Sequence, residues 1–329
     1  MQSQIDVVVI GGGAAGLAGA VALARSRRSV LVIDAGKPRN APAEGVHNFL
    51  TREGTPPAEL LAIGRAEVTG YGGQVVSGRV TDVSRNADGV GFTVRLADGD
   101  EVQARRILVT SGAADVLPEI PGLAERWGHD VLHCPFCHGW ESRDRAIGIL
   151  GTGPMAVHAT LLWRQISPDV TLFLHTAPPL TPEQAEQLAA LNVPVVEGHV
   201  AELVITNDHL SGVRMVNGDV ISREIVVAGS LVHAHVDFLD GLGLTTTPFE
   251  MGGQVLATRL EPGPSGSTDV PGVWIAGNVA DPMGQVIGSA ADGLRAGAAI
   301  NMDLITEDTA RAVEAYRAAN SALAGARAG

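Results

Sequence analysis

The chain has 329 residues, which is room for roughly two domains of ordinary size. Hydrophobic residues make up 45% and charged residues 18%, so the chain can bury a core and lacks the composition of a disordered protein. The net charge is −13 and no basic block occurs, which argues against binding to nucleic acid or to an anionic membrane surface. Cys134 and Cys137 are the two cysteines, so a framework of several disulfides is excluded.

The first predicted elements are a short strand at Asp6–Ile10, a turn at Gly11–Gly16, a helix at Leu17–Arg27 and a strand at Ser29–Asp34. A strand, a G-x-G-x-x-G turn, a helix and a second strand that ends in an acid form the dinucleotide-binding fingerprint. The helix N-terminus offers N–H groups to a pyrophosphate, so this segment predicts an ADP-binding fold. We expect neither a signal peptide nor a membrane-spanning helix here, and therefore a cytoplasmic location.

The same pattern recurs about 140 residues later, as a strand at Ala146–Leu150, a G-x-G-x-x-A turn at Gly151–Ala156, a helix and a strand at Val170–Leu174. A β-meander is predicted after each copy, from Val75 to Val109 and from Val195 to Val227. Two copies of one architecture indicate an internal duplication. We therefore expect an α/β fold with two doubly wound Rossmann-like nucleotide-binding domains, each carrying a β-meander.

The second domain is predicted to be inserted in the first. Ala113–Gly122 has the prolines of a linker that crosses to the second domain, and Asp240–Pro248 is predicted to be the segment by which the chain returns to the first domain. The remaining tail is too short for a third domain of this kind; it holds a predicted helix at Gln285–Leu304 and an Ala-rich helix at Glu307–Gly329. The predicted boundaries are 1–115 and 243–329 for the discontinuous first domain, and 116–242 for the inserted domain.

The reactive motif is the pair Cys134 and Cys137, which stands directly before the first strand of the second copy. A Cys-x-x-Cys brackets one turn, which brings the sulfurs within bonding range and lowers one thiol pKa, so a redox-active pair is favoured. Three other interpretations stay open: haem attachment through C-x-x-C-H with His138, a zinc site completed by His133 and His138, and an inert buried pair. Haem attachment requires export, and adjacent residues rarely ligate the same ion.

Over nearly its full length the chain resembles the thioredoxin-reductase class of flavoprotein disulfide oxidoreductases. The matching segments are the first glycine turn with Asp34, the cysteine pair, Val46–Phe49, Thr110–Gly112 and Ala276–Asn278 with Gln285. The stretch Cys134–Glu141 is similar to the branch that contains the FAD-dependent dithiol oxidases, which close disulfides in gliotoxin, holomycin and romidepsin. The fingerprint by itself predicts an ADP-binding fold, and the resemblance names FAD as the cofactor.

The resemblance implies that the FAD pyrophosphate lies at Gly13, its ribose at Asp34 and its isoalloxazine near Asn48. The family usually has Asp where this chain has Asn278, which keeps hydrogen bonding but loses the charge. The helix from Gln285 would direct its partial positive end at the flavin N1–C2=O. The cofactor-binding residues expected in this way are Gly11, Gly13, Ala14, Ala15, Gly16, Asp34, Ala35, Asn48, Gly112, Gly277, Asn278, Gln285 and Val286.

The resemblance also assigns catalytic roles. The second cysteine of this class faces the flavin, so Cys137 would exchange electrons with the flavin C4a, and Cys134 would form a mixed disulfide with the substrate. His138 stands where thioredoxin reductases usually carry Asp, and its imidazole could take a proton from a thiol. We favour a packing role for His133, and we expect no metal site.

The direction of electron flow is predicted from the second copy. Reductases of this class follow its second strand with a basic His-Arg-Arg segment that pairs with the NADPH 2′-phosphate, whereas this chain has His175–Pro179, with neither an Arg pair nor an acid for NADH. We therefore favour an oxidase that passes electrons from a small dithiol substrate to O2, giving H2O2. The alternatives are an NADPH-dependent thioredoxin or disulfide reductase and a flavin-binding redox sensor or assembly partner. The family is usually homodimeric, and we expect the same here.

Overall fold

The computed structural model describes residues 4–328 and contains two sheets built largely of parallel strands. The first has the strand order β3-β2-β1-β6-β5-β4, with β19 paired to β6. Its strands are β1 (Ile5–Ile10), β2 (Val30–Asp34), β3 (Gln74–Ser77), β4 (Val80–Arg85), β5 (Phe92–Leu96), β6 (Glu101–Val109) and β19 (Val273–Ile275). The pairs β3–β2, β2–β1, β1–β6 and β6–β19 are parallel, and β4, β5 and β6 form an antiparallel meander.

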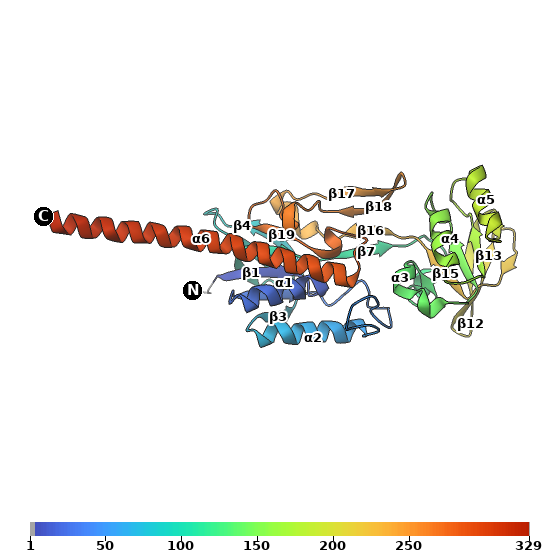
Figure 1. Cartoon of the computed structure of the whole chain (residues 1–329), viewed down its shortest axis with the longest axis horizontal. Helices are drawn as coiled ribbons and strands as arrows, with labels where there is room; N and C mark the ends of the chain where they lie inside the picture. Colours follow the sequence, from blue (N-terminus) through green and yellow to red (C-terminus); the bar gives the residue numbers. More distant parts are fainter. Residues whose placement is uncertain (1–3, 329) are drawn as a thin grey trace.

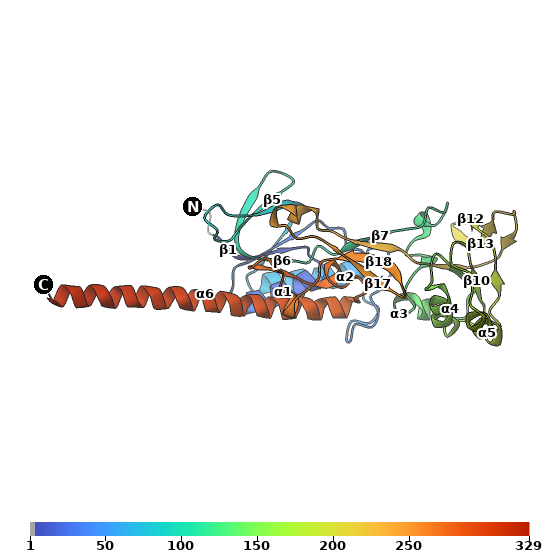
Figure 2. The ribbon, with the colours of Figure 1, turned by 90° about the horizontal axis from the view of Figure 1, so that it is seen from above.

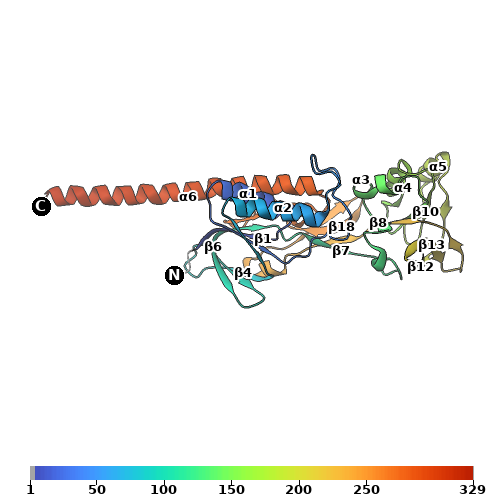
Figure 3. The same cartoon turned by 90° about the horizontal axis from the view of Figure 1, so that it is seen from below.

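Helices cover one face of this sheet and the meander covers the other (Figure 3). The helices are α1 (Ala14–Arg25), α2 (Pro57–Gly70) and α6 (Val286–Ala328). Alternate residues of β1 serve the two faces, because successive side chains of a strand point in opposite directions. Val7 and Val9 pack with the helices, whereas Val8 and Ile10 pack with the meander. The continuous apolar run of β1 is therefore explained by burial on both sides.

Helix α6 lies directly on α1 because small residues line their contact. A Cβ on Gly293 would lie 1.9 Å from the carbonyl oxygen of Ala15, and a Cβ on Gly297 would lie 2.8 Å from that of Gly19. Both distances are impossible for real side chains, so the two backbones meet only because glycine stands at these positions. This close contact brings the N-terminal ends of α1 and α6 to the same place.

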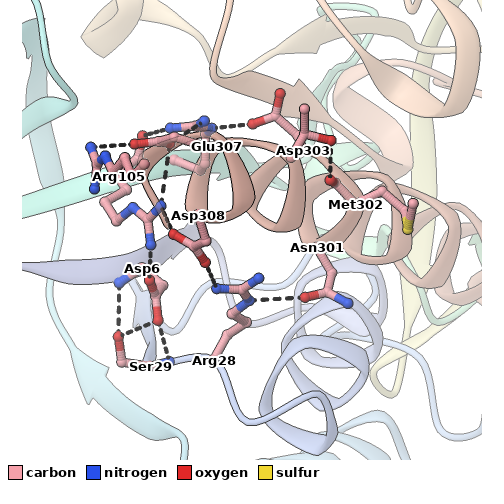
Figure 4. A network of polar contacts seen from close by, with 12 residues as sticks. Asp6, Arg28, Ser29, Arg105, Asn301, Met302, Asp303, Glu307 and Asp308 are labelled. Atoms are coloured by element: carbon pink, nitrogen blue, oxygen red, sulfur yellow. Dashed lines mark hydrogen bonds and ion pairs between the residues drawn. The ribbon is translucent and has the colours of Figure 1, made fainter. Parts of the chain in front are cut away.

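The C-terminal segment forms one helix, which corrects the prediction of two helices separated near Ile305 and Thr306. Figures 1 and 2 show α6 running along the first sheet and then continuing away from the body of the protein. Ion pairs anchor the helix on both sides of the expected break: Arg106 of β6 contacts Asp303 and Glu307. Figure 4 shows Arg105, also of β6, in contact with Asp308 beyond the break. Arg28 adds a contact with Asp308 at 2.6 Å. Pairing with β6 thus favours a continuous helix through this point.

The second sheet repeats the plan of the first. Its parallel strands have the order β11-β10-β9-β15-β8, which matches β3-β2-β1-β6 over the shared part. They are β8 (Val131–Leu132), β9 (Ile147–Leu150), β10 (Val170–Phe173), β11 (Val195–Val196) and β15 (Ile225–Ala228). Helices α4 (Ala156–Arg164) and α5 (Pro182–Ala190) cover one face, and the meander β12 (Val200–Thr206), β13 (His209–Met215) and β14 (Val220–Ile221) covers the other. The predicted fold class is confirmed.

The predicted meanders were too long. Strands β3 and β11, which begin them in the prediction, pair in parallel with β2 and β10 and belong to the central sheets. In the first copy β6 pairs both with β1 of the central sheet and with β5 of the meander. In the second copy two strands share these pairings: β15 pairs with β9 of the sheet, and β14 pairs with β13 of the meander. Short strands next to a turn give the same local pattern in either arrangement, and only pairing decides between them.

Strands that the sequence pattern did not indicate lie in and beside the predicted linkers Ala113–Gly122 and Asp240–Pro248. A four-stranded sheet has the order β17-β18-β16-β7 and joins segments from both crossings. Its strands are β7 (Ala113–Val116), β16 (Leu231–Ala234), β17 (Thr247–Met251) and β18 (Gln254–Arg259). The domain boundaries at 115/116 and 242/243 fall at or near this sheet and stay predictions.

The remaining elements are short. They are α3 (Pro135–His138) and the 3-10 turns η1 (Ala124–Arg126), η2 (Trp140–Ser142), η3 (Asp237–Leu242), η4 (Pro264–Gly266) and η5 (Gly277–Val279). Of the helices in the described part of the chain, none is both long and apolar enough to cross a membrane.

Candidate functional site

One cavity of about 1090 Å³ extends from the first glycine turn to the cysteine turn. It is lined by most of the residues that the sequence singled out, from segments far apart in the chain. These are Gly11, Gly13, Ala14, Ala15, Asp34, Ala35, Gly112, Cys134, Cys137, His138, Gly277, Asn278, Gln285 and Val286. Two predicted site residues, Gly16 and Asn48, do not line the cavity. Gly16 packs against the Gly11 carbonyl, and Asn48 contacts the cysteine turn.

The first glycine turn leaves its backbone open to the cavity. A Cβ on Gly11 would lie 2.3 Å from Thr110 O, and a Cβ on Gly16 would lie 2.0 Å from Gly11 O, so both positions require glycine for packing. A Cβ on Gly13 would meet no atom within 4 Å. Gly13 is also the N-cap of α1, and no side chain caps this helix. The N–H groups of its first turn are therefore available to a phosphate, as FAD requires.

Asp34 lies at the end of β2, beside this turn. A Cβ on Gly12 would lie 2.7 Å from the Asp34 Cγ, so the turn and the carboxylate are in direct contact. A second recess of about 300 Å³ is lined by Asp34–Lys37 and Ser77–Arg79. A carboxylate between a phosphate-binding turn and a separate recess suits the ribose and adenine of a dinucleotide.

Asn278 braces the loop that leads into α6. Its Nδ2 donates hydrogen bonds to Asp281 O and Gly284 O, each at 2.9 Å. Gln285 O then accepts the hydrogen bond from Ser289 N at 2.8 Å, which begins the helix. An ionised aspartate has no hydrogen to donate to these two carbonyls. The departure from the family's Asp therefore has a structural consequence here, because the amide fixes the loop at the cavity wall.

The cysteine turn places its two sulfurs 2.6 Å apart, and Cys134 is the N-cap of α3. The pKa of Cys134 is lowered to about 7, mainly because the Cys137 thiol donates a hydrogen bond to its sulfur, aided by the backbone N–H groups of Cys137 and Phe136. The same shared hydrogen bond, with burial, raises the pKa of Cys137. In the reduced pair, Cys134 is therefore the thiolate and Cys137 retains the proton.

Both flanking histidines line the cavity, but their neighbours differ. His138 lines the cavity, and burial lowers its pKa, so the neutral imidazole is available as a proton acceptor. His133 stacks on Trp127 with ring centroids 5.4 Å apart. Burial lowers the pKa of His133 to about 4, so it is neutral near pH 7. The stacking agrees with a packing role for His133.

Arg39 is a cavity residue that the sequence analysis missed. Its Nε and Nη2 bind the Asp115 carboxylate at 2.7 and 2.6 Å, and its Nη1 donates to Pro282 O at 3.0 Å. Its positive charge helps to lower the pKa of Cys134. Arg39 stands in no recognisable motif, and its partners are distant in the sequence, so the only available signal was one cation shortly after Asp34.

The side chain of Asn48 is directed toward the cysteine turn. Its Nδ2 donates to Phe136 O at 2.6 Å. The neighbouring His47 lines the cavity, and its Nδ1 lies 2.7 Å from Glu53 Oε1. A contact of Asn48 with the isoalloxazine stays a prediction, since the observed hydrogen bond goes to the turn between the cysteines.

The second glycine turn, Gly151–Ala156, is covered by the chain itself. The tip of the β17–β18 hairpin rests on it: a Cβ on Gly153 would lie 2.1 Å from the Gln254 Oε1, and a Cβ on Gly252 would lie 2.8 Å from the Met155 sulfur. The turn and the hairpin thus pack closely at two points, where Gln254 of the hairpin meets Gly153 and Met155 of the turn meets Gly252. No sequence motif indicates this contact, because the tip of the hairpin follows the predicted return segment Asp240–Pro248, in a stretch for which no element was predicted.

The position equivalent to Asp34 in the second copy is Leu174. In the first copy Ile10 pairs with Ile33, and Asp34 follows; in the second copy Leu150 pairs with Phe173, and Leu174 follows. Leucine has no oxygen to accept hydrogen bonds from a ribose. Next to it, His175 Nδ1 accepts the backbone hydrogen bond of Val200 at 3.1 Å and is occupied structurally.

Within residues 4–328, no group of three or more His, Cys, Asp or Glu side chains is placed to hold a metal ion.

Comparison with known proteins identifies the family. The sequence matches the pyridine nucleotide-disulphide oxidoreductase family over residues 5–297, and the chain belongs to it. Thioredoxin reductase sirT of Leptosphaeria maculans is 29% identical, over 94% of this chain and 97% of that protein. The crystal structure of HlmI is 44% identical with a TM-score of 0.87, over 96% of this chain and 97% of that one. The oxidoreductase from Agrobacterium tumefaciens is 32% identical with a TM-score of 0.85, over 92% and 99% of the two chains.

The chain is thus a thioredoxin-reductase-like flavoprotein that binds FAD and acts on sulfur groups. The first glycine turn, the adjoining carboxylate and the open cavity fit this cofactor.

Proposed function

We propose that the chain is an FAD-dependent dithiol oxidase that forms an intramolecular disulfide in a small dithiol, with O2 as the electron acceptor. The observation that carries this proposal is the state of the second glycine turn. Gln254 rests on Gly153, where the backbone of a functional turn must approach a pyrophosphate, and Leu174 stands where a ribose-binding acid belongs. Without a nicotinamide dinucleotide, the electrons must enter through the cysteine pair.

The chemistry at the cysteine pair is thiol–disulfide exchange. A substrate thiolate attacks Cys134 Sγ of the Cys134–Cys137 disulfide, and Cys137 leaves as a thiolate. The second substrate thiolate then attacks the substrate sulfur of the mixed disulfide, and Cys134 leaves. A thiol of low pKa is the better leaving group, so the pKa of about 7 at Cys134 favours release of the cyclic disulfide.

Neutral His138 accepts a proton from the entering thiol in this proposal, and the lowering of its pKa by burial supports this role. The two electrons of the dithiol then reside on the reduced pair, and of its two protons one is held by Cys137 and the other by His138. When bound between the first glycine turn and the cysteine turn, FAD supplies the two-electron acceptor chemistry that side chains lack. The overall balance is dithiol plus O2 giving cyclic disulfide plus H2O2. We include a homodimer and a cytoplasmic location in the proposal as expectations from the family and the sequence.

The test is an anaerobic titration of the flavin absorbance of the purified protein. NADPH is added first, a small dithiol such as dithiothreitol second, and air last. We expect no bleaching with NADPH, bleaching with the dithiol, and recovery in air with one peroxide formed for each dithiol oxidised. The variants Cys134→Ser and Cys137→Ser should bind flavin but resist bleaching by the dithiol.

Prompt bleaching by NADPH would overturn the oxidase and favour the NADPH-dependent reductase. Absence of any bleaching by dithiols, with flavin bound, would favour a redox sensor without turnover.

A further inference from the structure

The two copies are joined at the crossing by more than the chain itself. Strand β7 leaves the first copy and β16 returns to it, and the two pair antiparallel (Figure 1). Asp115 of β7 accepts two hydrogen bonds from Arg39, at 2.7 and 2.6 Å, and one from Ser230, directly before β16, at 2.6 Å. Arg39 also donates to Pro282 O in the loop before α6. One guanidinium therefore ties both crossing strands to two loops of the first copy.

The loop 46–55 of the first copy contacts the cysteine turn. A backbone hydrogen bond of 2.8 Å joins the ends of this loop and closes it. From the closed loop, Asn48 Nδ2 donates to Phe136 O at 2.6 Å. His47 Nε2 lies 3.6 Å from the Glu141 carboxylate, just beyond the turn. The segment that carries the cysteines is thus held by two consecutive residues of the other copy.

The β17–β18 hairpin touches the second copy at a different place. Its base belongs to the first copy, because Leu260, directly after β18, is buried in the core of the first sheet. The N–H of Leu260 also donates to Val279 O at 2.9 Å. The tip of the hairpin lies on the second glycine turn, where a Cβ on Gly252 would be 2.8 Å from the Met155 sulfur. The hairpin therefore reaches from one copy to the other.

These contacts lie side by side along one edge of the second sheet. The cysteine turn follows β8, the returning strand follows β15 and the second glycine turn follows β9, and these parallel strands have the order β9-β15-β8. The carboxyl ends of neighbouring parallel strands lie about 4.8 Å apart at one edge of a sheet. The crossing is therefore a hinge with a contact on each side. Rotation of the second copy about this hinge would have to break at least one of the contacts.

Two domains joined by a crossing are expected to move relative to each other unless their interface prevents it. We propose that the contacts at the crossing, the cysteine turn and the second glycine turn form an interdomain brace, which keeps the second copy in one orientation throughout turnover. The cysteine turn then reacts with the dithiol and with the flavin from the same place, in a cavity lined by both copies. The role in turnover rests on the proposed function, because an enzyme that takes its electrons from a dithiol can leave the second glycine turn covered.

The first experiment compares the orientation of the two copies in the two redox states. Small-angle X-ray scattering is recorded from the oxidised holoprotein and from the holoprotein reduced anaerobically with dithionite. We expect the two scattering curves to superpose within error, because the brace contains neither the flavin nor the cysteine sulfurs. A reproducible difference between the curves would overturn the proposal.

The second experiment fixes the contact at the hairpin covalently. The double variant Met155→Cys with Gly252→Cys is treated in the oxidised state with dibromobimane, which links two thiols through thioethers that dithiols cannot reduce. The resident cysteine pair is protected as its disulfide. We expect the bridged protein to be bleached by dithiothreitol and reoxidised by air at the rates of the unbridged variant. Met155→Cys alone, alkylated with monobromobimane, is the matched control and carries the same group without the bridge.

A rate that falls about tenfold or more in the bridged protein, with the control unaffected, would show that turnover requires movement and would sink the brace. A folded variant in which the bridge does not form would do the same, because the hairpin and the turn would then not be in contact in solution.

The third experiment tests Arg39 as a positioning residue. Arg39→Met removes the tie at the crossing, so the second copy should spend less of its time in the competent orientation. We expect bleaching by dithiothreitol to slow about tenfold and the bimane bridge between positions 155 and 252 to restore it. A bridge that restores nothing would mean that Arg39 acts at the flavin or the cysteines and has no part in the brace.

Failure of the parent protein to be bleached by any dithiol would count against the proposed oxidase. The scattering comparison uses dithionite, so it would still decide whether the orientation is fixed.

Discussion

The two glycine turns of this protein are copies of one motif, but they differ in what lies above them. Gly13 of the first turn faces a cavity, and a Cβ there would meet no atom within 4 Å. Gly153 of the second turn is in contact with Gln254, and a Cβ there would lie 2.1 Å from its side-chain oxygen. Strand order is the same in both copies, although α1 begins at Ala14, directly after Gly13, and α4 begins at Ala156, three residues after Gly153. The motif therefore places a glycine turn after the first strand of each copy, and the neighbouring segment determines whether a ligand can reach it.

The cysteine turn lies between the two copies and is approached from the first one. Loop 46–55 contacts it through Asn48, and Arg39 lies on the cavity wall near it. The second copy supplies its framework, because the cysteine pair stands directly between β8 and β9. In the proposed oxidase, the duplicated domain would thus have kept a structural task after losing access to a dinucleotide.

The largest expected effect comes from substituting the open turn. Gly13→Val would place a side chain where the backbone must approach the pyrophosphate. We expect FAD affinity to fall at least about 100-fold, since two charge-assisted hydrogen bonds of about 1.5 kcal/mol each are lost. The measurement is the ratio of flavin to protein absorbance after dialysis, with circular dichroism to check the fold. Gly153→Val, at the same position of the covered turn, should retain the flavin; if it loses as much flavin as Gly13→Val, the contrast between the turns is wrong.

The second effect is expected at Asn278, in the loop that leads into α6 at the cavity wall. Asn278→Asp replaces two donated hydrogen bonds by a carboxylate that faces two carbonyls. We expect the free energy of unfolding to fall by about 2 kcal/mol, since two hydrogen bonds of a half-buried side chain are lost at about 1 kcal/mol each. Chemical denaturation of the holoprotein and the apoprotein measures it, and the loss should be present in both forms. A variant of unchanged stability would mean that the amide does not brace the loop.

The pH dependence of the cysteine pair gives the next effect. Because the pKa of Cys134 is lowered to about 7, the thiolate fraction falls as the pH drops through 7 and is nearly complete above 8. In the reduced protein, alkylation should therefore decrease about tenfold for each pH unit below about 6.5 and level off above 8. Mass spectrometry should find the label on Cys134 and little on Cys137, whose pKa is raised. Preferential labelling of Cys137 would reverse the assignment.

The smallest effect is expected at the covered turn. Gln254→Ala removes the side chain that rests on Gly153 but leaves the hairpin glycines in place. We expect a loss of about 1 kcal/mol in stability, which lowers the melting temperature by about 2 to 4 °C for a chain of this size. The rate of flavin bleaching by dithiothreitol should stay the same, because the cysteine turn is not altered. Val255→Ala, on an exposed neighbouring position, serves as the control.

Much of this arrangement was available from local sequence pattern. The first strand, turn, helix and acid-ended strand were predicted within a few residues, and so was their repetition after the cysteine pair. Patterns of this kind depend on residues close together in the chain. The glycines permit the turn, the apolar run forms the buried strand and the terminal acid is suited to a ribose. The same local view misassigned β3 and β11 to the meanders and gave two helices instead of α6, since pairing between distant segments decided both.

The sequence by itself determined the class of fold, the dinucleotide-binding first turn and the reactive cysteine pair, because each is encoded by neighbouring residues. Only the tertiary structure decided which glycine turn is open, because Gln254 and Gly153 are about 100 residues apart and share no motif. It also decided where Asn48 and Arg39 act, since their partners lie on other segments. A motif fixes the backbone that could receive a ligand, and packing fixes whether that backbone is free.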